Sequence, residues 1–166
     1  MKKDYERFLK LNPEEFDQDE EKGWRKLDKE GKSLEAAEVI ETYLDMNKDK
    51  LRDGSADNAE LEKVMHFHIG QLLSFSGSKH YEEAIQHFQK SLQPNREGWN
   101  YYVGGTVAFL QKDKKNLNQN IKGLQDLERK LGIGIGNLDI LEHFAVSLRK
   151  GETSYKKAMN GLEAAN

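Results

Sequence analysis

Apolar residues recur every three or four positions along most of this chain, which is the spacing of one face of an α-helix. The stretches with this spacing follow one another in pairs, and a short polar turn joins the members of each pair. We therefore expect a helix pair within residues 1–48, two hairpins within 59–130 and a last hairpin within 137–165. The pattern predicts an all-α fold of seven to eight helices in a single domain, 1–166.

Several residues predict where the helices begin and end. Asn12 and Pro13 predict a helix start, because asparagine caps well and proline suits the first helical position. We expect this helix to run to Gly31, since glycine tolerates the left-handed geometry of a helix end. Ser33 and Asn137 are expected to cap two later helices.

Two stretches interrupt the helical pattern. The first, 47–58, is polar, contains Asp-Gly and predicts a loop around residues 53–57. The second, 132–136, places three glycines at every other position, as in part of a dinucleotide-binding fingerprint. That fingerprint requires a strand before it, and here a helical pattern precedes the glycines. We therefore expect a flexible connection at 132–136 and no nucleotide site.

Two heptapeptides that begin 34 residues apart correspond position by position. They are IGQLLSF at 69–75 and VGGTVAF at 103–109, in which glycine and phenylalanine recur and the other apolar and small positions largely match. A fixed period of about 34 residues is the length of one helix–turn–helix repeat unit. Each unit leaves an apolar face that the next unit covers, so we expect the hairpins to stack.

The residues within 60–130 resemble the tetratricopeptide repeat family. That family places Leu-Gly on the first helix of a unit, aromatic residues and an alanine on the second, and a proline at its end. Here Ile69-Gly70 stands on a first helix, and the second carries Tyr81, Ala84, Phe88 and Pro94. The next unit keeps Val103-Gly104 but lacks the small and aromatic residues of its second helix. The resemblance implies stacked antiparallel hairpins in a right-handed superhelix.

The family usually binds peptides or helices in a groove that its first helices form. The resemblance therefore implies partner contacts at six positions: Phe67, Gln71, Ser74, Tyr101, Gly105 and Ala108. An aromatic, weakly charged groove of this kind suits an apolar or helical partner. The alternative is that Phe67 and Tyr101 pack under a neighbouring helix.

Charge is unevenly distributed along the sequence. Residues 1–62 hold 19 acidic and 12 basic residues, a net charge of −7, whereas 63–166 hold 10 and 14, a net charge of +4. The overall charge of −3 argues against a nucleic-acid binder. Two solvated surfaces of opposite sign would explain the asymmetry, and so would an acidic face that attracts a basic partner. The second interpretation points to Asp17, Asp19, Glu20 and Glu21.

The sequence contains no signature of catalysis or metal binding. It has no cysteine, no phosphate-binding loop and no nucleophile elbow. His66 and His68 are two residues apart and so point to different sides of a helix. We expect no enzyme activity, no cofactor and no metal site. The charged N-terminus lacks the apolar core of a signal peptide, and no long apolar segment is present, so we expect a cytoplasmic protein without a membrane anchor.

These observations favour a non-catalytic protein–protein interaction module that binds a protein or peptide. One form of this hypothesis is a stoichiometric inhibitor, such as an immunity protein that neutralises a basic toxin. A second class is a small-molecule binder or enzyme that uses a pocket between helices, lined by His66, Gln71, Tyr101 and His143. A third class is a structural unit that self-associates as a weak homodimer, for which exposed Tyr155 and Leu162 would be the marker.

Overall fold

The computed structural model describes residues 5–51 and 56–164, and these ranges contain helices and no strand. The helices are α1 (Glu6–Leu9), α2 (Pro13–Gln18), α3 (Trp24–Lys29), α4 (Ser33–Met46), α5 (Lys48–Leu51), α6 (Ala56–Phe75), the 3₁₀ helix η1 (Ser78–His80), α7 (Tyr81–Lys90), α8 (Glu97–Leu110), α9 (Lys114–Leu131), α10 (Leu138–Arg149) and α11 (Tyr155–Glu163). The all-α prediction is confirmed. The predicted count of seven to eight helices is wrong, because the N-terminal region divides into more and shorter helices.

The helix expected from Pro13 to Gly31 is two helices, α2 and α3. The backbone is extended at Asp19, whose side chain accepts hydrogen bonds from the amides of Glu21 and Lys22 at 2.9 and 3.0 Å. Such a side-chain turn competes with continuation of the helix. Gly23 then packs directly on the carbonyl oxygen of Phe16, where any Cβ would collide with backbone. The turn therefore folds α3 back toward α2.

The capping predictions have mixed outcomes. The Asn12 side chain accepts a hydrogen bond from the amide three residues later, and Gly31 has a φ of +75°, as predicted. Ser33 does not cap, because it is the first residue of α4 and its hydroxyl donates to Asp28 at 2.7 Å. Asn137 stands before α10 with a φ of +76° and forms no side-chain cap. Its left-handed backbone points the side chain away from the helix amides.

The loop predicted around residues 53–57 extends too far on its C-terminal side, because residues 56 and 57 belong to a helix. Residues 52–55 lie outside the described part of the chain, and α6 already begins at Ala56. The short helix α5 also lies within the polar stretch that the sequence pattern left without structure. The break predicted at 132–136 is confirmed, since α9 ends at a left-handed Gly132 and α10 begins after it.

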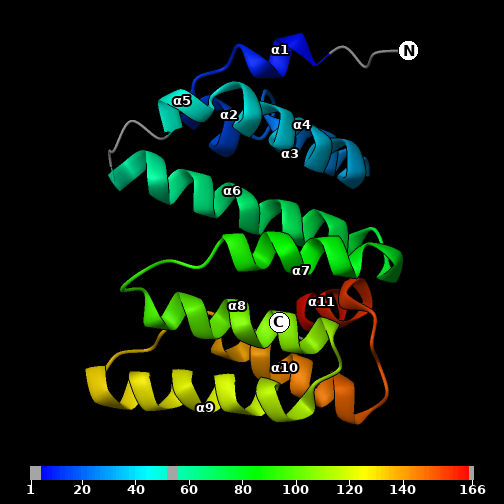
Figure 1. The fold of residues 1–166 in the computed structure, drawn as a ribbon. Coiled ribbons are helices and arrows are strands. Elements are labelled where there is room, and N and C mark those ends of the chain that lie inside the picture. The colour runs from blue at the N-terminus through cyan, green and yellow to red at the C-terminus, as the bar shows by residue number, and fades with distance from the viewer. Residues whose placement is uncertain (1–4, 52–55, 165–166) are drawn as a thin grey trace.

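The helices stack in chain order, from α1 at one end of the molecule to α9 and α10 at the other (Figure 1). Helix α4 packs on α3 and α6, α6 packs on α7, and α8 packs on α9 and α10. At the hairpin crossings the helices approach closely. An added Cβ on Gly70 would lie 2.8 Å from the Phe88 ring of α7, and one on Gly104 would lie 2.6 Å from Asn120 of α9.

Helix α11 turns back to contact α6 (Figure 1). Tyr155 is fully buried there, with its ring 5.2 Å from Phe75 and 5.6 Å from Phe144. The Tyr81 hydroxyl of α7 accepts a hydrogen bond from the Tyr155 amide at 2.7 Å and donates to the Thr153 carbonyl at 3.3 Å. Tyr155 is therefore an internal packing residue and not the exposed marker of self-association.

Candidate functional site

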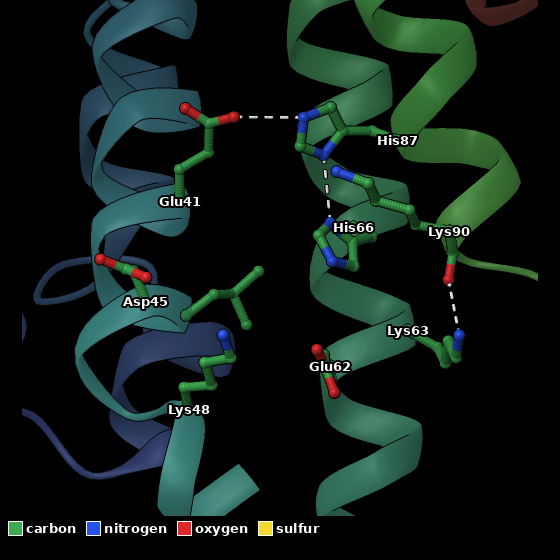
Figure 2. Close-up of a pocket in the computed structure, with 9 residues that line it drawn as sticks. Glu41, Asp45, Lys48, Glu62, Lys63, His66, His87 and Lys90 are labelled. Atoms are coloured by element: carbon green, nitrogen blue, oxygen red, sulfur yellow. Dashed lines mark hydrogen bonds and ion pairs between the residues drawn. The ribbon is translucent and has the colours of Figure 1, made fainter. Parts of the chain in front are cut away.

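A charged cleft lies between α4 and α5 on one side and α6 and α7 on the other (Figure 2). It has a volume of about 430 Å³ and opens to solvent. Four helices supply its lining: Glu41, Leu44 and Asp45 from α4, Lys48 from α5, Glu62, Lys63 and His66 from α6, and His87 and Lys90 from α7. Carboxylates of α4 thus face imidazoles and amines across the cleft.

Three of these side chains form a hydrogen-bonded series that crosses the cleft (Figure 2). His87 Nε2 lies 3.1 Å from Glu41 Oε1, and His87 Nδ1 lies 3.1 Å from His66 Nδ1. His87 is 6% exposed, whereas Glu41 reaches solvent. When His87 donates to Glu41 through Nε2, its Nδ1 accepts the proton carried by Nδ1 of His66. The series therefore fixes the orientation of both rings.

The surroundings favour one charge state for this series. Burial is the main reason that the pKa of His66 is lowered to about 4, and the neighbouring His87 and Lys90 add to this effect. The hydrogen bond from His87 lowers the pKa of the Glu41 carboxyl, although partial burial opposes this. At neutral pH, His66 is therefore an uncharged imidazole beside an ionised Glu41. Such a histidine is a hydrogen-bonding group more than a strong general base.

The remaining charges of the cleft differ in how they are engaged. The Lys63 amine donates to the Lys90 carbonyl at 2.9 Å and so ties α6 to α7 (Figure 2). Asp45 is exposed on α4 and has no ion-pair partner among the residues that the structure describes. The α4 wall therefore presents an available carboxylate to the cleft.

One further acid stands beside the series. Glu83 of α7 is exposed, and its carboxylate, that of Glu41 and a ring nitrogen of His87 all lie within 4.8 Å of one another. Within residues 5–51 and 56–164, these are the three side chains placed so that they can hold a metal ion. The sequence analysis predicted no metal site, because His66 and His68 point to different sides of a helix and the chain has no two-histidine zinc-binding helix motif.

Four of the six residues predicted to face a groove, namely Phe67, Ser74, Gly105 and Ala108, are buried. Phe67 is 4% exposed, and its ring packs 5.2 Å from Phe88 and 4.7 Å from Trp99. Ser74 is fully buried and donates to a carbonyl of its own helix, and Ala108 is 2% exposed. In this arrangement a partner does not reach these side chains. For Phe67, the structure shows the packing that was the alternative to a partner contact.

Tyr101 and Gly105 lie against neighbouring helices, whereas Gln71 contacts a residue of its own helix. Tyr101 covers Gly123 of α9, and Gly105 is so close to α10 that an added Cβ would lie 2.5 Å from Leu141. Gln71 is half-buried, with its amide oxygen 3.3 Å from a histidine of α6. The structure thus does not bring these six residues together in one open surface.

Asp17 has an internal role in the structure. Its side chain is 2% exposed and accepts a hydrogen bond from the Trp24 indole at 3.1 Å. His68 Nε2 lies 3.6 Å away and the Arg25 guanidinium 4.0 Å away. Burial is the main cause that lowers the pKa of His68. Asp17 therefore joins the α2–α3 segment to α6.

The other three acids predicted to attract a partner lie near the surface but are already engaged. Asp19 accepts the two amide hydrogen bonds of the turn between α2 and α3. Glu20 and Glu21 lie 2.6 and 3.4 Å from the Lys29 amine. Exposed pairs of this kind exchange readily with water, so Glu20 and Glu21 remain accessible.

The residues of the cleft were mostly missed by sequence reasoning. His66 was considered, but Glu41, Asp45 and Glu83 were not singled out, because nothing local distinguishes them from solvated acids. The contact between His66 and His87 could have been predicted from their spacing, because the two residues stand at similar sequence distances before and after the hairpin turn at Gly77. Antiparallel helices bring such positions side by side.

No protein-family model, curated protein or solved structure matches this chain. None of the described helices combines the length and the apolar character needed to cross a membrane. The cleft between α4 and the α6–α7 hairpin is therefore the feature of the chain from which a function can be inferred.

Proposed function

We propose that this chain is a non-catalytic protein-binding module built from tetratricopeptide-like hairpins. The repeat interpretation is supported by Gly70 and Gly104, which stand 34 residues apart. Each faces the second helix of its own hairpin: Gly70 lies against the ring of Phe88, and Gly104 lies against the flexible amide end of Asn120. Equivalent close crossings in consecutive hairpins are what a repeat unit requires. Stacks of this kind present surfaces along several helices, which is why they serve mainly in binding.

The observation that carries the binding proposal is the open, charged cleft. Its α4 wall presents Glu41 and Asp45, and Asp45 has no ion-pair partner among the described residues. A lysine or arginine of a partner that enters the cleft would pair with these carboxylates. Because both carboxylates are exposed, such a pair acts mainly by attracting a basic partner and by selecting against an acidic one. The partner we propose is therefore a protein with a basic segment.

This geometry shifts the proposed contact away from the acids first considered. Asp17 is buried, so reversal of its charge would disturb the fold and would not report on binding. Glu20 and Glu21 contribute through long-range attraction, whereas Asp45 is placed for a direct contact. A stoichiometric inhibitor of a basic protein remains the specific form of this proposal, since tight binding of that kind uses acidic surfaces to speed association.

The test begins with capture of partners from the native lysate on the tagged chain, at low and at moderate salt, with identification by mass spectrometry. Affinity for a captured basic protein is then measured for Asp45→Lys and for Glu14→Lys, an exposed acid of α2 outside the cleft. We expect Asp45→Lys to weaken binding by at least about tenfold and Glu14→Lys by less than about threefold. Equal effects of the two variants, or no dependence on salt, would contradict binding in the cleft.

A second candidate is a small-molecule binder in the same cleft. Its volume of about 430 Å³ lies within the usual range for ligand sites. Of the four residues predicted to line a pocket, His66 lines this cleft, whereas His143 faces Gly161 of α11. The lysines and His66 would suit a small polar molecule. Mass spectrometry of the purified, heat-denatured protein decides this candidate, because a bound metabolite in one equivalent would favour it over a protein partner.

A further inference from the structure

Two helices place metal-ligating side chains beside the contact between Glu41 and His87. Glu83 and His87 are four residues apart on α7 and so lie on one helix face. Glu41 reaches them from α4, and the ligand atoms of the three residues lie within 4.8 Å of one another. Figure 2 shows the Glu41 carboxylate directed at the His87 ring. One point in space is therefore accessible to an imidazole nitrogen and two carboxylates.

The distances agree with a small divalent ion. Zinc binds nitrogen and oxygen at about 2.0–2.2 Å, so two ligands of a tetrahedral ion lie about 3.3 Å apart. His87 Nε2 and Glu41 Oε1 are already 3.1 Å apart. Glu83 is exposed, so its side chain can rotate the remaining distance without disturbing the core. The ligand atoms thus need small side-chain adjustments and no backbone movement.

The histidine is held as a metal ligand would be. His87 is 6% exposed, and its Nε2 faces the Glu41 carboxylate. When His87 binds a metal through Nε2, its own proton is on Nδ1. His66 Nδ1 lies 3.1 Å from His87 Nδ1 and can accept the hydrogen bond from it. Ligating histidines almost always have such a partner, which fixes the tautomer and the ring orientation. His66 is therefore a positioning residue for this site.

We propose that Glu41, Glu83 and His87 bind one divalent transition-metal ion of the zinc class, with His66 positioning His87. One imidazole and two carboxylates suit zinc and its neighbours, whereas calcium takes six to eight oxygens. Two carboxylates balance the charge of the ion, although Lys90 in the same cleft opposes binding. Three protein ligands leave a coordination position for water or for a side chain of a partner.

The site would also join two parts of the fold. Glu41 belongs to α4 and the other ligands to α7, so the ion would link the N-terminal helices to the α6–α7 hairpin across the cleft. An ion bound only by the folded state raises the stability of that state. Metal binding should therefore raise the melting temperature of the chain as well as appear in a titration.

The experiment is calorimetric titration of the EDTA-treated full chain with zinc chloride. We expect one equivalent to bind, with affinity lowered at least about tenfold by Glu83→Gln and about tenfold by His66→Phe. The matched control is Glu82→Gln, an exposed acid next in sequence that lies outside the ligand group, and it should change affinity less than about twofold. Circular dichroism of each variant verifies that it is folded.

Nitrogen NMR of the histidine rings supplies a second measurement. Zinc should shift His87 Nε2 and leave its Nδ1 protonated, and this signature should be lost in Glu83→Gln but kept in Glu82→Gln. Absence of a one-equivalent site, or equal zinc affinity in the two variants, would overturn the proposal. Zinc that binds elsewhere, for example at an exposed histidine, would give the same affinity in both variants and so counts against it.

Discussion

Replacement of Asp17 by alanine is expected to destabilise this protein strongly, whereas the same change at Glu20 is not. Both residues belong to the acidic N-terminal region, and by sequence they are equivalent. Asp17 is 2% exposed and lies within 3.1 Å of the Trp24 indole, 3.6 Å of His68 and 4.0 Å of Arg25. Glu20 is exposed and contacts the Lys29 amine. The comparison tests whether burial decides the role of an acid here.

The magnitude follows from the contacts that are lost. Trp24 is 4% exposed, so its indole N–H would be left buried without an acceptor, which costs about 1–3 kcal/mol. Arg25 is partly exposed and can turn to water, so loss of its pairing adds less than about 1 kcal/mol. We therefore expect Asp17→Ala to lower the free energy of unfolding by about 1–4 kcal/mol. Asp17→Asn should cost less, because its amide oxygen still accepts from the indole.

The assay is urea denaturation at neutral pH, followed by circular dichroism and tryptophan fluorescence. Circular dichroism reports the helices and fluorescence reports the indole environment. In both signals the urea midpoint should be highest for the wild type, lower for Asp17→Asn and lowest for Asp17→Ala. Glu20→Ala should unfold at the wild-type midpoint within error. Equal urea midpoints for Asp17→Ala and Glu20→Ala would refute a stabilising role of buried Asp17, because removal of a buried charge-assisted contact lowers the free energy of unfolding.

Three further predictions concern packing, pH and the last helix. Gly105→Ala should destabilise by about 1–3 kcal/mol, because its Cβ would press on a buried leucine of α10. Gly104→Ala, where the nearest group is the amide end of a flexible side chain, should be neutral or stabilising in the same melting experiment. The pKa of His66 is lowered to about 4 in the folded chain from the ordinary value of 6.5, so the unfolded chain takes up the proton first as pH falls. The free energy of unfolding should therefore fall by about 1–2 kcal/mol between pH 6.5 and pH 4. In His66→Asn, the free energy of unfolding should depend less steeply on pH over this range. Tyr81→Phe removes two hydrogen bonds to the start of α11, and hydrogen exchange should show faster opening of that helix, whereas unchanged protection would contradict its anchoring role.

The fold was predictable to the extent that its signals are local. Apolar spacing placed two hairpins within 59–130 and a last hairpin within 137–165, and the structure has α6 to α9 over 56–131 and α10 and α11 over 138–163. The N-terminal region was less predictable, because the apolar spacing continues across the turn at Asp19. That turn is made by side-chain hydrogen bonds and by the close approach of Gly23 to α2, which a hydrophobic pattern does not record.

The candidate site was much less predictable. Phe67, Ser74 and Ala108 were assigned to a groove by analogy, but the stacking of the helices buries them. The angle at which each hairpin meets the next determines which face remains open, and that angle depends on many side chains at once. An outward position in one stack is therefore an internal position in another.

The sequence by itself determined that this chain is helical, where most helices begin, and that two consecutive hairpins contain a glycine at the same place in a 34-residue period. These properties depend on neighbours three or four residues away. Only the tertiary structure decided that Asp17 is buried and that Glu41, His66 and His87 meet across a cleft. The side chains that meet across the cleft come from three helices. They are brought together by the packing of the whole stack, which depends on residues far apart in the sequence and not on any local pattern.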